Sequence, residues 1–204
     1  MTHLVLIRHG QTHTPQDAWF RGQVDVPLDE VGLAQAAATA QRVIKTWTPQ
    51  AVYSSPLARA RQTAELIAAP LGIAVRVHEG LTDINYGVWQ GLRMHEVRAR
   101  WFKTLMVWNT RPHHAVIPGG ETLTAVQVRV LKALQEIITT HPHDTLVVVA
   151  HAVVNRLIML RALGWNCERF WDLQQKNCSL CAVEIEDLSA DTYHVALMND
   201  VSHL

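Results

Sequence analysis

Hydrophobic residues lie along this chain either in short continuous runs or at helical spacing. Residues 4–7 and 145–150 are almost entirely Leu, Val and Ile, which is typical of strands covered on both faces and so of a parallel sheet. Residues 51–54 and 74–77 predict two further short strands. Apolar residues recur every three or four positions in three other segments, which predicts three helices. The three stripes are Leu33, Ala36, Ala40 and Val43; Met94, Val97, Trp101, Leu105 and Trp108; and Leu123, Val126, Val130, Leu134 and Ile137.

A fourth helix is predicted after residues 51–54. Ser55-Pro56-Leu57 has the form of a helix start, with Ser55 as the cap and proline in the first turn, and the helix should run to about Ala69. Residues 181–186 and 193–198 alternate or nearly alternate, with turn-forming residues 189–191 between them, which predicts a C-terminal hairpin. Residues 109–120 resemble a long loop. Strands that alternate with helices indicate a layered α/β fold, and we expect a single domain over residues 1–204.

The composition narrows the classes of partner and of compartment. The chain has 204 residues, 18 basic and 18 acidic, and no net charge, so no overall basic field attracts nucleic acid or an anionic membrane. There is no apolar run of 18 residues, and residues 1–7 are too short for a secretory signal. Cys167, Cys178 and Cys181 lack zinc-like spacing and read as packing residues. We expect a cytoplasmic protein, as a monomer or a homodimer.

Two histidines each follow one of the long apolar strands. His9 comes after residues 4–7 and His151 directly after residues 145–150, and the carboxyl ends of parallel strands are where α/β proteins form their sites. Arg8 precedes His9, Gly10 follows it, and Arg59 lies in the first turn of the predicted fourth helix. Two arginines beside two imidazoles form a clamp that suits a phosphoryl dianion, and an imidazole nitrogen can attack phosphorus.

Cofactors and metals are not required by such a site. The sequence has no Gly-rich nucleotide loop of the P-loop type and no cluster of Asp and Glu suited to a metal pair. We therefore expect neither a metal ion nor another cofactor.

Six sequence blocks resemble the histidine phosphatase superfamily, the phosphoglycerate-mutase-like proteins, in the order in which that family carries them. They are residues 6–12 (Leu-Ile-Arg-His-Gly-Gln-Thr), 21–22 with 25–32, 54–64, 81–87 with 89–91, 118–121 (Pro-Gly-Gly-Glu) and 149–151 (Val-Ala-His). Together they extend over about residues 4–155. The resemblance implies a three-layer α/β/α sandwich around a mixed, mostly parallel sheet.

The resemblance also implies a role for each site residue. His9 would be phosphorylated, Asp83 would be the proton donor, and Arg8, Arg59 and His151 would bind the phosphoryl oxygens. The backbone amide of Ala152 would assist them. The expected surroundings of the phosphate pocket are Gln11, Thr12, Arg21 and Gly22.

The chain departs from the family pattern at several of these positions. Asp83 stands where the family most often has glutamate, with Glu79 as the reserve proton donor, and Ala152 replaces a glycine. Pro15 stands where many relatives have an asparagine that touches phosphate. Ile84 and Val153 occupy positions at which the mutase branch usually has arginine and asparagine, which weakens the mutase interpretation.

Three hypotheses follow, with a small phosphorylated molecule as the ligand in each. The first is a metal-independent phosphomonoesterase that uses a phosphohistidine on His9; the second is a cofactor-dependent phosphoglycerate mutase; the third is a non-catalytic phosphate-binding regulator. The natural substrate stays open among sugar phosphates, phosphoserine, α-ribazole phosphate and phosphoglycerates. Arg111, His113 and His114, in the predicted loop, are candidates for specificity.

Overall fold

A six-stranded mixed sheet forms the centre of the protein in its computed structural model, which describes residues 1–13, 20–187 and 192–204. The strand order is β3-β2-β4-β1-β5-β6. β1, β2, β3 and β4 are parallel, and β5 and β6 are antiparallel additions at one edge. The strands are β1 (Thr2–Arg8), β2 (Ala51–Ser54), β3 (Val75–Val77), β4 (Thr145–Ala150), β5 (Leu180–Asp187) and β6 (Thr192–Asp200).

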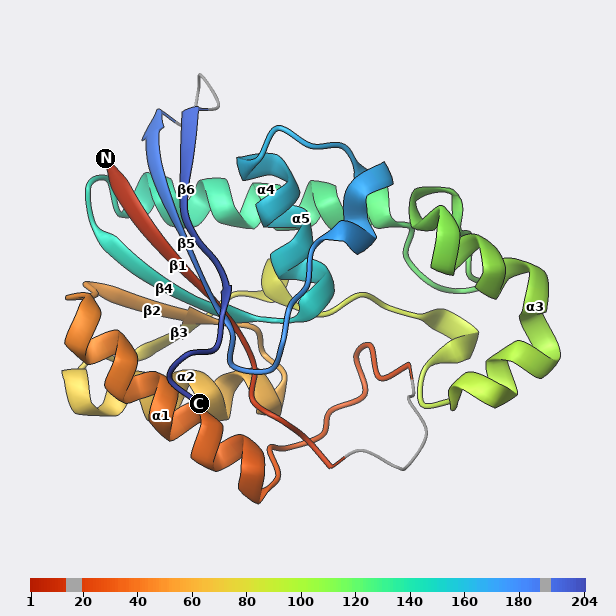
Figure 1. Cartoon of the computed structure of the whole chain (residues 1–204), viewed down its shortest axis with the longest axis horizontal. Coiled ribbons are helices and arrows are strands. Elements are labelled where there is room, and N and C mark those ends of the chain that lie inside the picture. The colour runs from red at the N-terminus through yellow and green to blue at the C-terminus, as the bar shows by residue number, and fades with distance from the viewer. Residues whose placement is uncertain (14–19, 188–191) are drawn as a thin grey trace.

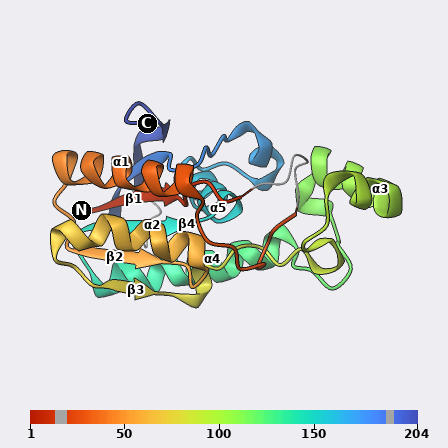
Figure 2. The ribbon, with the colours of Figure 1, turned by 90° about the horizontal axis from the view of Figure 1, so that it is seen from below.

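Helices cover both faces of the sheet, so the predicted three-layer sandwich is confirmed (Figures 1 and 2). One layer holds α1 (Glu30–Thr46) and α2 (Ala58–Ala68), whose apolar sides pack on Val5, Ile7 and Val52. The other holds α4 (Leu123–Thr140) and α5 (Ala152–Ala162), which pack on Leu4 and Leu6. Successive β1 residues therefore face opposite layers, as the pleat of a strand requires.

A third region extends from one end of the sandwich and is built on α3 (Met94–Thr110), at the right of Figure 1. The predicted stripe holds for Val97, Leu105 and Trp108, which are buried, but Trp101 has non-helical angles (φ −133°, ψ 44°) and kinks the helix. Single 3-10 segments connect the larger elements: η1 (Ala69–Leu71), η2 (Glu79–Leu81), η3 (Gly87–Trp89), η4 (Pro112–His114) and η5 (Cys167–Asp172).

Most predicted elements occur within a residue or two of their expected bounds. The strand expected at 74–77 begins at Val75, and the helix expected to end near Ala69 ends at Ala68. The C-terminal hairpin is present as β5 and β6, while its predicted turn at 189–191 lies outside the described residues, as does Pro15. The segment 109–120, predicted as a loop, begins with the last residues of α3 and contains η4.

One predicted helix cap is wrong. Ser55 does not cap α2, because the helix begins at Ala58 with Leu57 in the cap position. The amide of Ala58 donates instead to Oδ1 of Asp25, at 2.7 Å. A distant loop therefore satisfies the first turn of α2, and the hydroxyl of Ser55 accepts only from the amide of Leu57, at 3.3 Å, just before the helix.

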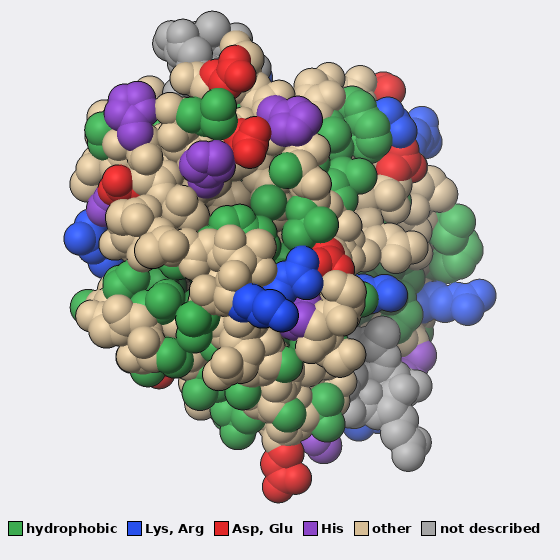
Figure 3. All heavy atoms as spheres, turned by 60° about the vertical axis from the view of Figure 1, so that its left-hand side comes forward, with side chains coloured by type: hydrophobic (Ala, Val, Ile, Leu, Met, Phe, Trp, Pro, Cys, Tyr) green, Lys and Arg blue, Asp and Glu red, His purple; other side chains and the backbone are tan. Residues whose placement is uncertain are grey.

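The charge distribution agrees with the neutral composition. Figure 3 shows one face of the molecule, on which basic, acidic and histidine side chains are interspersed. Within the described residues, no helix is long and apolar enough to cross a membrane.

Candidate active site

The predicted histidines lie together where β1 and β4 end. These neighbouring strands are parallel, with Arg8 opposite Ala150, so His9 and His151 emerge side by side. Their ring centroids are 5.2 Å apart at an interplanar angle of 57°. His9 is 3% exposed and His151 is fully buried. We call these two residues the histidine pair.

The ring of His9 is oriented by its own chain. Nδ1 lies 2.7 Å from the carbonyl oxygen of Gly10. Because a carbonyl can only accept, Nδ1 carries the proton and donates it, which leaves the lone pair on Nε2. Burial, with the nearby charges of Arg8 and Arg59, holds the pKa of His9 well below 6.5. A neutral imidazole with a free Nε2 is the form that acts as a nucleophile.

Gly10 allows the chain to leave β1 while its backbone passes very close to α1. A Cβ on Gly10 would lie 2.6 Å from the carbonyl oxygen of Gly32 in α1, so a side chain does not fit here. The amide of Gly10 donates to Oγ1 of Thr63 at 3.1 Å, and that hydroxyl donates to the carbonyl of Arg59 at 2.8 Å. The turn after His9 is thereby tied to α2.

Arg59 is fully buried and is held by the loop before α1. Nη1 donates to the carbonyl of Val24 at 2.9 Å, and Nη2 donates to the carbonyl of Gly22 at 2.7 Å and to Oδ2 of Asp83 at 3.2 Å. Its Nε is buried without a partner among the described residues. The predicted site residue Gly22 therefore contributes its carbonyl, from a backbone with φ +52°.

Arg8 and Arg21 complete the group of cations. Nη1 of Arg8 donates to the carbonyl of Gln175 at 2.6 Å, and its buried Nε has no partner within the described part of the chain. Burial, together with the charges of neighbouring arginines, lowers the pKa of Arg8 and of Arg21 to about 10 each. Cations crowded in this way are stabilised by a bound anion.

Asp83 lies between the cations and the histidine pair. Oδ2 accepts from Arg59 and lies 3.7 Å from Nδ1 of His151, and Oδ1 accepts from the amide of Ile84 at 3.0 Å. Burial raises the pKa of Asp83 and outweighs the opposing effect of Arg59. The reserve residue Glu79 is exposed in η2. Of the two carboxyl groups, only that of Asp83 contacts both Arg59 and the histidine pair in the described structure.

His151 contacts Ser55, the residue that was predicted to cap α2. Its Nε2 lies 2.8 Å from Oγ of Ser55, while the buried Nδ1 has no hydrogen-bond partner among the described residues. Burial, followed by the charge of Arg59, holds the pKa of His151 well below 6.5. Ala152 is the first residue of α5, and its amide belongs to the helix N-terminus, where backbone donors favour an anion.

The other predicted site residues take varied places. The amide group of Gln11 donates to Oδ2 of Asp29, the N-cap of α1, at 3.1 Å. Thr12 is buried and forms an isolated antiparallel β-bridge with Leu28. Arg111 is exposed, and the rings of His113 and His114 lie 4.1 Å apart in η4; no described contact brings these three to the histidine pair.

Arg129 is a site residue that sequence reasoning missed. From α4, its Nη1 donates to the carbonyls of Gly80 and Thr82 at 3.1 and 2.7 Å, and Nη2 donates to the carbonyl of Asp83 at 3.0 Å. Nε and Nη2 also donate to the two carboxylate oxygens of Glu121 at 2.7 and 2.9 Å. The backbone that carries Asp83 is thus fixed by a five-bond fork.

The amino-acid pattern offered no direct signal for Arg129, because an arginine on a helix is usually solvated. Glu121 did stand out as part of Pro-Gly-Gly-Glu, and it accepts from the amide of Asn85 at 2.9 Å. Ser55 was noticed, but for a role in capping.

The fold and this geometry define a class of protein: an α/β protein whose strand ends hold a neutral imidazole, an acidic carboxyl group and several arginines around one anion site. Such a set binds and polarises a phosphoryl group. Among the described residues, no three His, Cys, Asp or Glu side chains are placed to hold a metal ion.

Comparison with known proteins identifies the family. The profile of the Histidine phosphatase superfamily (branch 1) matches residues 4–200, and the chain belongs to this superfamily. It is 31% identical over 187 residues to phosphoserine phosphatase 1 of Hydrogenobacter thermophilus, covering 92% of this chain and 88% of that protein. It is 33% identical over 209 residues to a metal-independent phosphoserine phosphatase of Arabidopsis thaliana, covering 100% and 84%.

Solved structures agree with the sequence relatives. The structure of Bacillus stearothermophilus YhfR matches with a TM-score of 0.92 and 30% identity, over 100% of this chain and 99% of that one. The predicted phosphoglycerate-mutase-like fold is therefore confirmed, and the chain is an enzyme of the phosphatase class.

Proposed function

We propose that this enzyme is a metal-independent phosphomonoesterase that hydrolyses a small phosphorylated metabolite through a phosphohistidine on His9. The observation that carries the proposal is the hydrogen bond from Nδ1 of His9 to the carbonyl of Gly10. It leaves a neutral Nε2 available to attack phosphorus, in a ring of donors that suits the charge of the phosphoryl group.

In the first step, Nε2 of His9 attacks phosphorus and the bond to the ester oxygen breaks. Asp83 gives its proton to that oxygen, so the alcohol leaves neutral. The raised pKa of Asp83 supports this role, because a carboxyl group must hold its proton to act as an acid. Arg8, Arg59 and His151 stabilise the charge on the three equatorial oxygens, with the amide of Ala152 beside them.

In the second step, the Asp83 carboxylate takes a proton from a water molecule as that water attacks the phosphohistidine. The P–N bond breaks, inorganic phosphate forms, and His9 returns to its neutral state. Each step moves one phosphoryl group and one proton, and no redox change or metal-bound water is needed. The remaining expected contacts, with Arg21 and Thr12, would line the rim of the same pocket.

Hydrolysis is favoured over the mutase reaction by two buried side chains. Ile84 and Val153 stand where the mutase branch usually has arginine and asparagine, and both are packed in the core. Neither can hold a polar group of a substrate. The relatives named phosphoserine phosphatase make O-phosphoserine the first natural compound to test.

The experiment is hydrolysis of p-nitrophenyl phosphate in excess EDTA by the wild type, by His9→Ala and by His194→Ala as a control for an exposed histidine. We expect the wild type and His194→Ala to be equally active and His9→Ala to lose activity by more than about 10³-fold. Full activity of His9→Ala, or complete inhibition of the wild type by EDTA, would overturn the proposal. A rate of 3-phosphoglycerate isomerisation far above that of hydrolysis would favour the mutase instead.

A further inference from the structure

Ser55 lies at the end of β2, beside the second member of the histidine pair. β2 and β4 are parallel neighbours with Ser54 opposite Val149, and the amide of Ser55 donates to the carbonyl of Val149 at 3.1 Å. The end of β2 is therefore tied to β4 two residues before His151. Ser55 and His151 are both fully buried, and Oγ of Ser55 lies 2.8 Å from Nε2 of His151.

The hydrogen bonds around the Ser55 hydroxyl fix its direction. Oγ accepts from the amide of Leu57 at 3.3 Å. The hydroxyl hydrogen needs an acceptor of its own, because a buried donor without a partner is destabilising. Within the described structure, Nε2 of His151 is the one acceptor in contact with it. If Nε2 carried a proton, two N–H groups would point at Oγ and the hydroxyl hydrogen would have no acceptor. Ser55 therefore donates to Nε2, and the proton of the neutral ring is on Nδ1.

Nδ1 of His151 faces the anion site. It lies 3.7 Å from Oδ2 of Asp83 and is buried without a hydrogen-bond partner among the described residues. With the proton on Nδ1, the ring offers a donor to a phosphoryl oxygen; with the proton on Nε2, it would offer a lone pair, which repels that oxygen. Burial and the charge of Arg59 hold the pKa of His151 well below 6.5, so the ring is not a cation with donors at both nitrogens.

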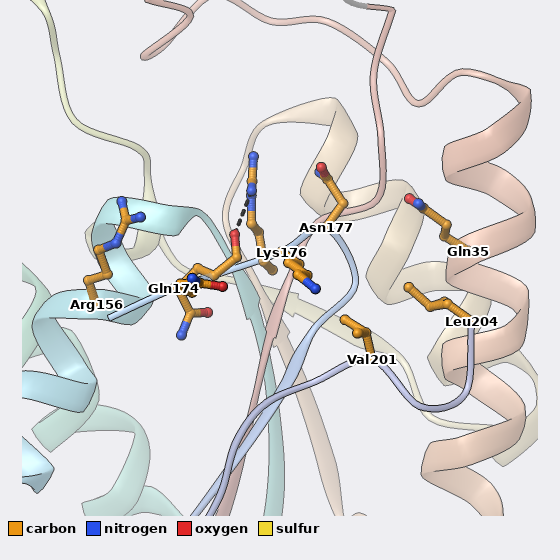
Figure 4. A pocket seen from close by; sticks show the side chains of 9 residues that line it. Gln35, Arg156, Gln174, Lys176, Asn177, Val201 and Leu204 are labelled. Atoms are coloured by element: carbon orange, nitrogen blue, oxygen red, sulfur yellow. Dashed lines mark hydrogen bonds between the residues drawn. The ribbon is translucent and has the colours of Figure 1, made fainter. Parts of the chain in front are cut away.

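The arginines of the site do not depend on their partners in this way. Nη1 of Arg8 donates to the carbonyl of Gln175 at 2.6 Å, and Figure 4 shows the loop at 174–177 that carries this carbonyl, between Arg156 of α5 and Gln35 of α1. A guanidinium has no acceptor atom, so its remaining N–H groups are donors whichever group holds the first. A neutral imidazole has one donor and one acceptor, so its partner decides which of the two faces the phosphoryl group.

The partners of the histidine pair give the two rings opposite roles. The carbonyl of Gly10 accepts from Nδ1 of His9, so the lone pair of Nε2 is left for phosphorus. The hydroxyl of Ser55 occupies Nε2 of His151, so the N–H of Nδ1 is left for a phosphoryl oxygen. Both rings are the same tautomer, yet one presents a nucleophile and the other a donor.

We propose that Ser55 is a positioning residue that holds His151 in its Nδ1–H tautomer, so that a neutral ring donates to an equatorial oxygen of the phosphoryl group. This inference rests on the proposed phosphomonoesterase function and adds to it a residue that does not contact the reacting atoms. Without the hydroxyl, nothing in the described structure keeps the proton on Nδ1, and the site loses a reliable donor to the phosphoryl group.

The kinetic test is a double-mutant cycle with p-nitrophenyl phosphate as the substrate. Ser55→Ala should lower kcat/KM by about 10- to 100-fold, the effect of one hydrogen bond to a charged group. Ser179→Ala, which removes another fully buried hydroxyl that has no described partner, should lower it by less than about threefold. In a His151→Ala background, Ser55→Ala should also cost less than about threefold, because Ser55 acts through the ring.

The second measurement reads the tautomer directly. Nitrogen NMR of the wild type with isotope-labelled histidine, in which the signals of His151 are assigned from their absence in His151→Ala, should show a protonated Nδ1 and an unprotonated Nε2 at neutral pH. In Ser55→Ala this preference should be lost. Two results would overturn the proposal: a proton on Nε2 in the wild type, or a Ser55→Ala effect on kcat/KM that is the same with and without His151.

These outcomes separate the role of Ser55 from the function on which it rests. If the wild type hydrolyses p-nitrophenyl phosphate while Nε2 of His151 carries the proton, the role of Ser55 fails and the phosphomonoesterase function stands. If the wild type hydrolyses no phosphate ester, that function fails, and the spectrum still decides the tautomer. The wild-type spectrum also decides it if Ser55→Ala does not fold.

Discussion

Replacing the proposed proton donor by asparagine separates acid catalysis from phosphate binding. In Asp83 the amide of Ile84 donates to Oδ1 at 3.0 Å and Nη2 of Arg59 donates to Oδ2 at 3.2 Å. The single oxygen of Asp83→Asn can keep one of these two bonds, so the size of the side chain is kept while the proton and one acceptor are lost. General acid catalysis contributes about 10²- to 10⁴-fold, or about 3–5 kcal/mol of the activation barrier.

The leaving group decides how much of this loss appears. An alkyl ester such as O-phosphoserine needs a proton on its departing oxygen, so its kcat/KM should fall by the full factor. p-Nitrophenolate leaves without a proton, so its cleavage should fall by less than about tenfold. In the wild type, kcat/KM for the alkyl ester should decline as pH rises through the raised pKa of Asp83, because the acid form is then lost.

The assay is release of inorganic phosphate from both esters across a pH series. Asp83→Glu, which restores a proton donor one methylene longer, should retain more alkyl-ester activity than Asp83→Asn, and Asp172→Asn serves as a control at an exposed aspartate. Equal losses on the aryl and alkyl esters, or an unchanged alkaline limb of the pH profile in Asp83→Asn, would refute the assignment.

Three further predictions concern the support of the site. Arg129→Met should lower kcat by about tenfold and the free energy of unfolding by about 2–3 kcal/mol, because the carbonyl of Asp83 loses its hydrogen bond from Arg129. Kinetics and chemical denaturation measure the two effects. A fall in stability with no change in kcat would contradict the positioning role. The wild type should lose up to about 1.4 kcal/mol of stability per pH unit for each member of the histidine pair as pH falls below 6.5, because protonation favours the unfolded chain. Denaturation curves at a series of pH values measure this loss. A free energy of unfolding that does not change between pH 7 and 5 would argue against neutral buried rings. Gly10→Ala should cost about 1–3 kcal/mol, because its Cβ would meet the Gly32 carbonyl at 2.6 Å; a melting temperature equal to that of the wild type would show that this turn gives way.

The strand ends were predictable because each strand is a short continuous hydrophobic run, a local pattern that is typical of a parallel sheet. Placing Arg8, His9 and His151 together required only that residues 4–7 and 145–150 be neighbouring parallel strands, and the register of Arg8 opposite Ala150 meets that condition. Arg59 was found through the helix that follows β2. The resemblance to the family supplied Asp83, which no periodicity indicates.

The features that were missed depend on contacts between distant segments. α5 gave no amphipathic stripe, because Val153, Val154, Leu157 and Ile158 are buried around much of its surface, and a helix that is apolar on most sides shows no period. The hydroxyl of Ser55 contacts His151, 96 positions away, although its local sequence indicates a helix cap. Such pairings are set by the packed fold and leave no mark on the local pattern.

The most direct test of the central claim is to trap the phosphorylated enzyme. O-phosphoserine or p-nitrophenyl phosphate is mixed with the wild type for milliseconds, the reaction is quenched, and the protein is digested for mass spectrometry. The account predicts one acid-labile, base-stable phosphoryl group on His9, at less than one per chain, and none in His9→Ala. A phosphoryl group on another residue, or rapid turnover by His9→Ala, would contradict it.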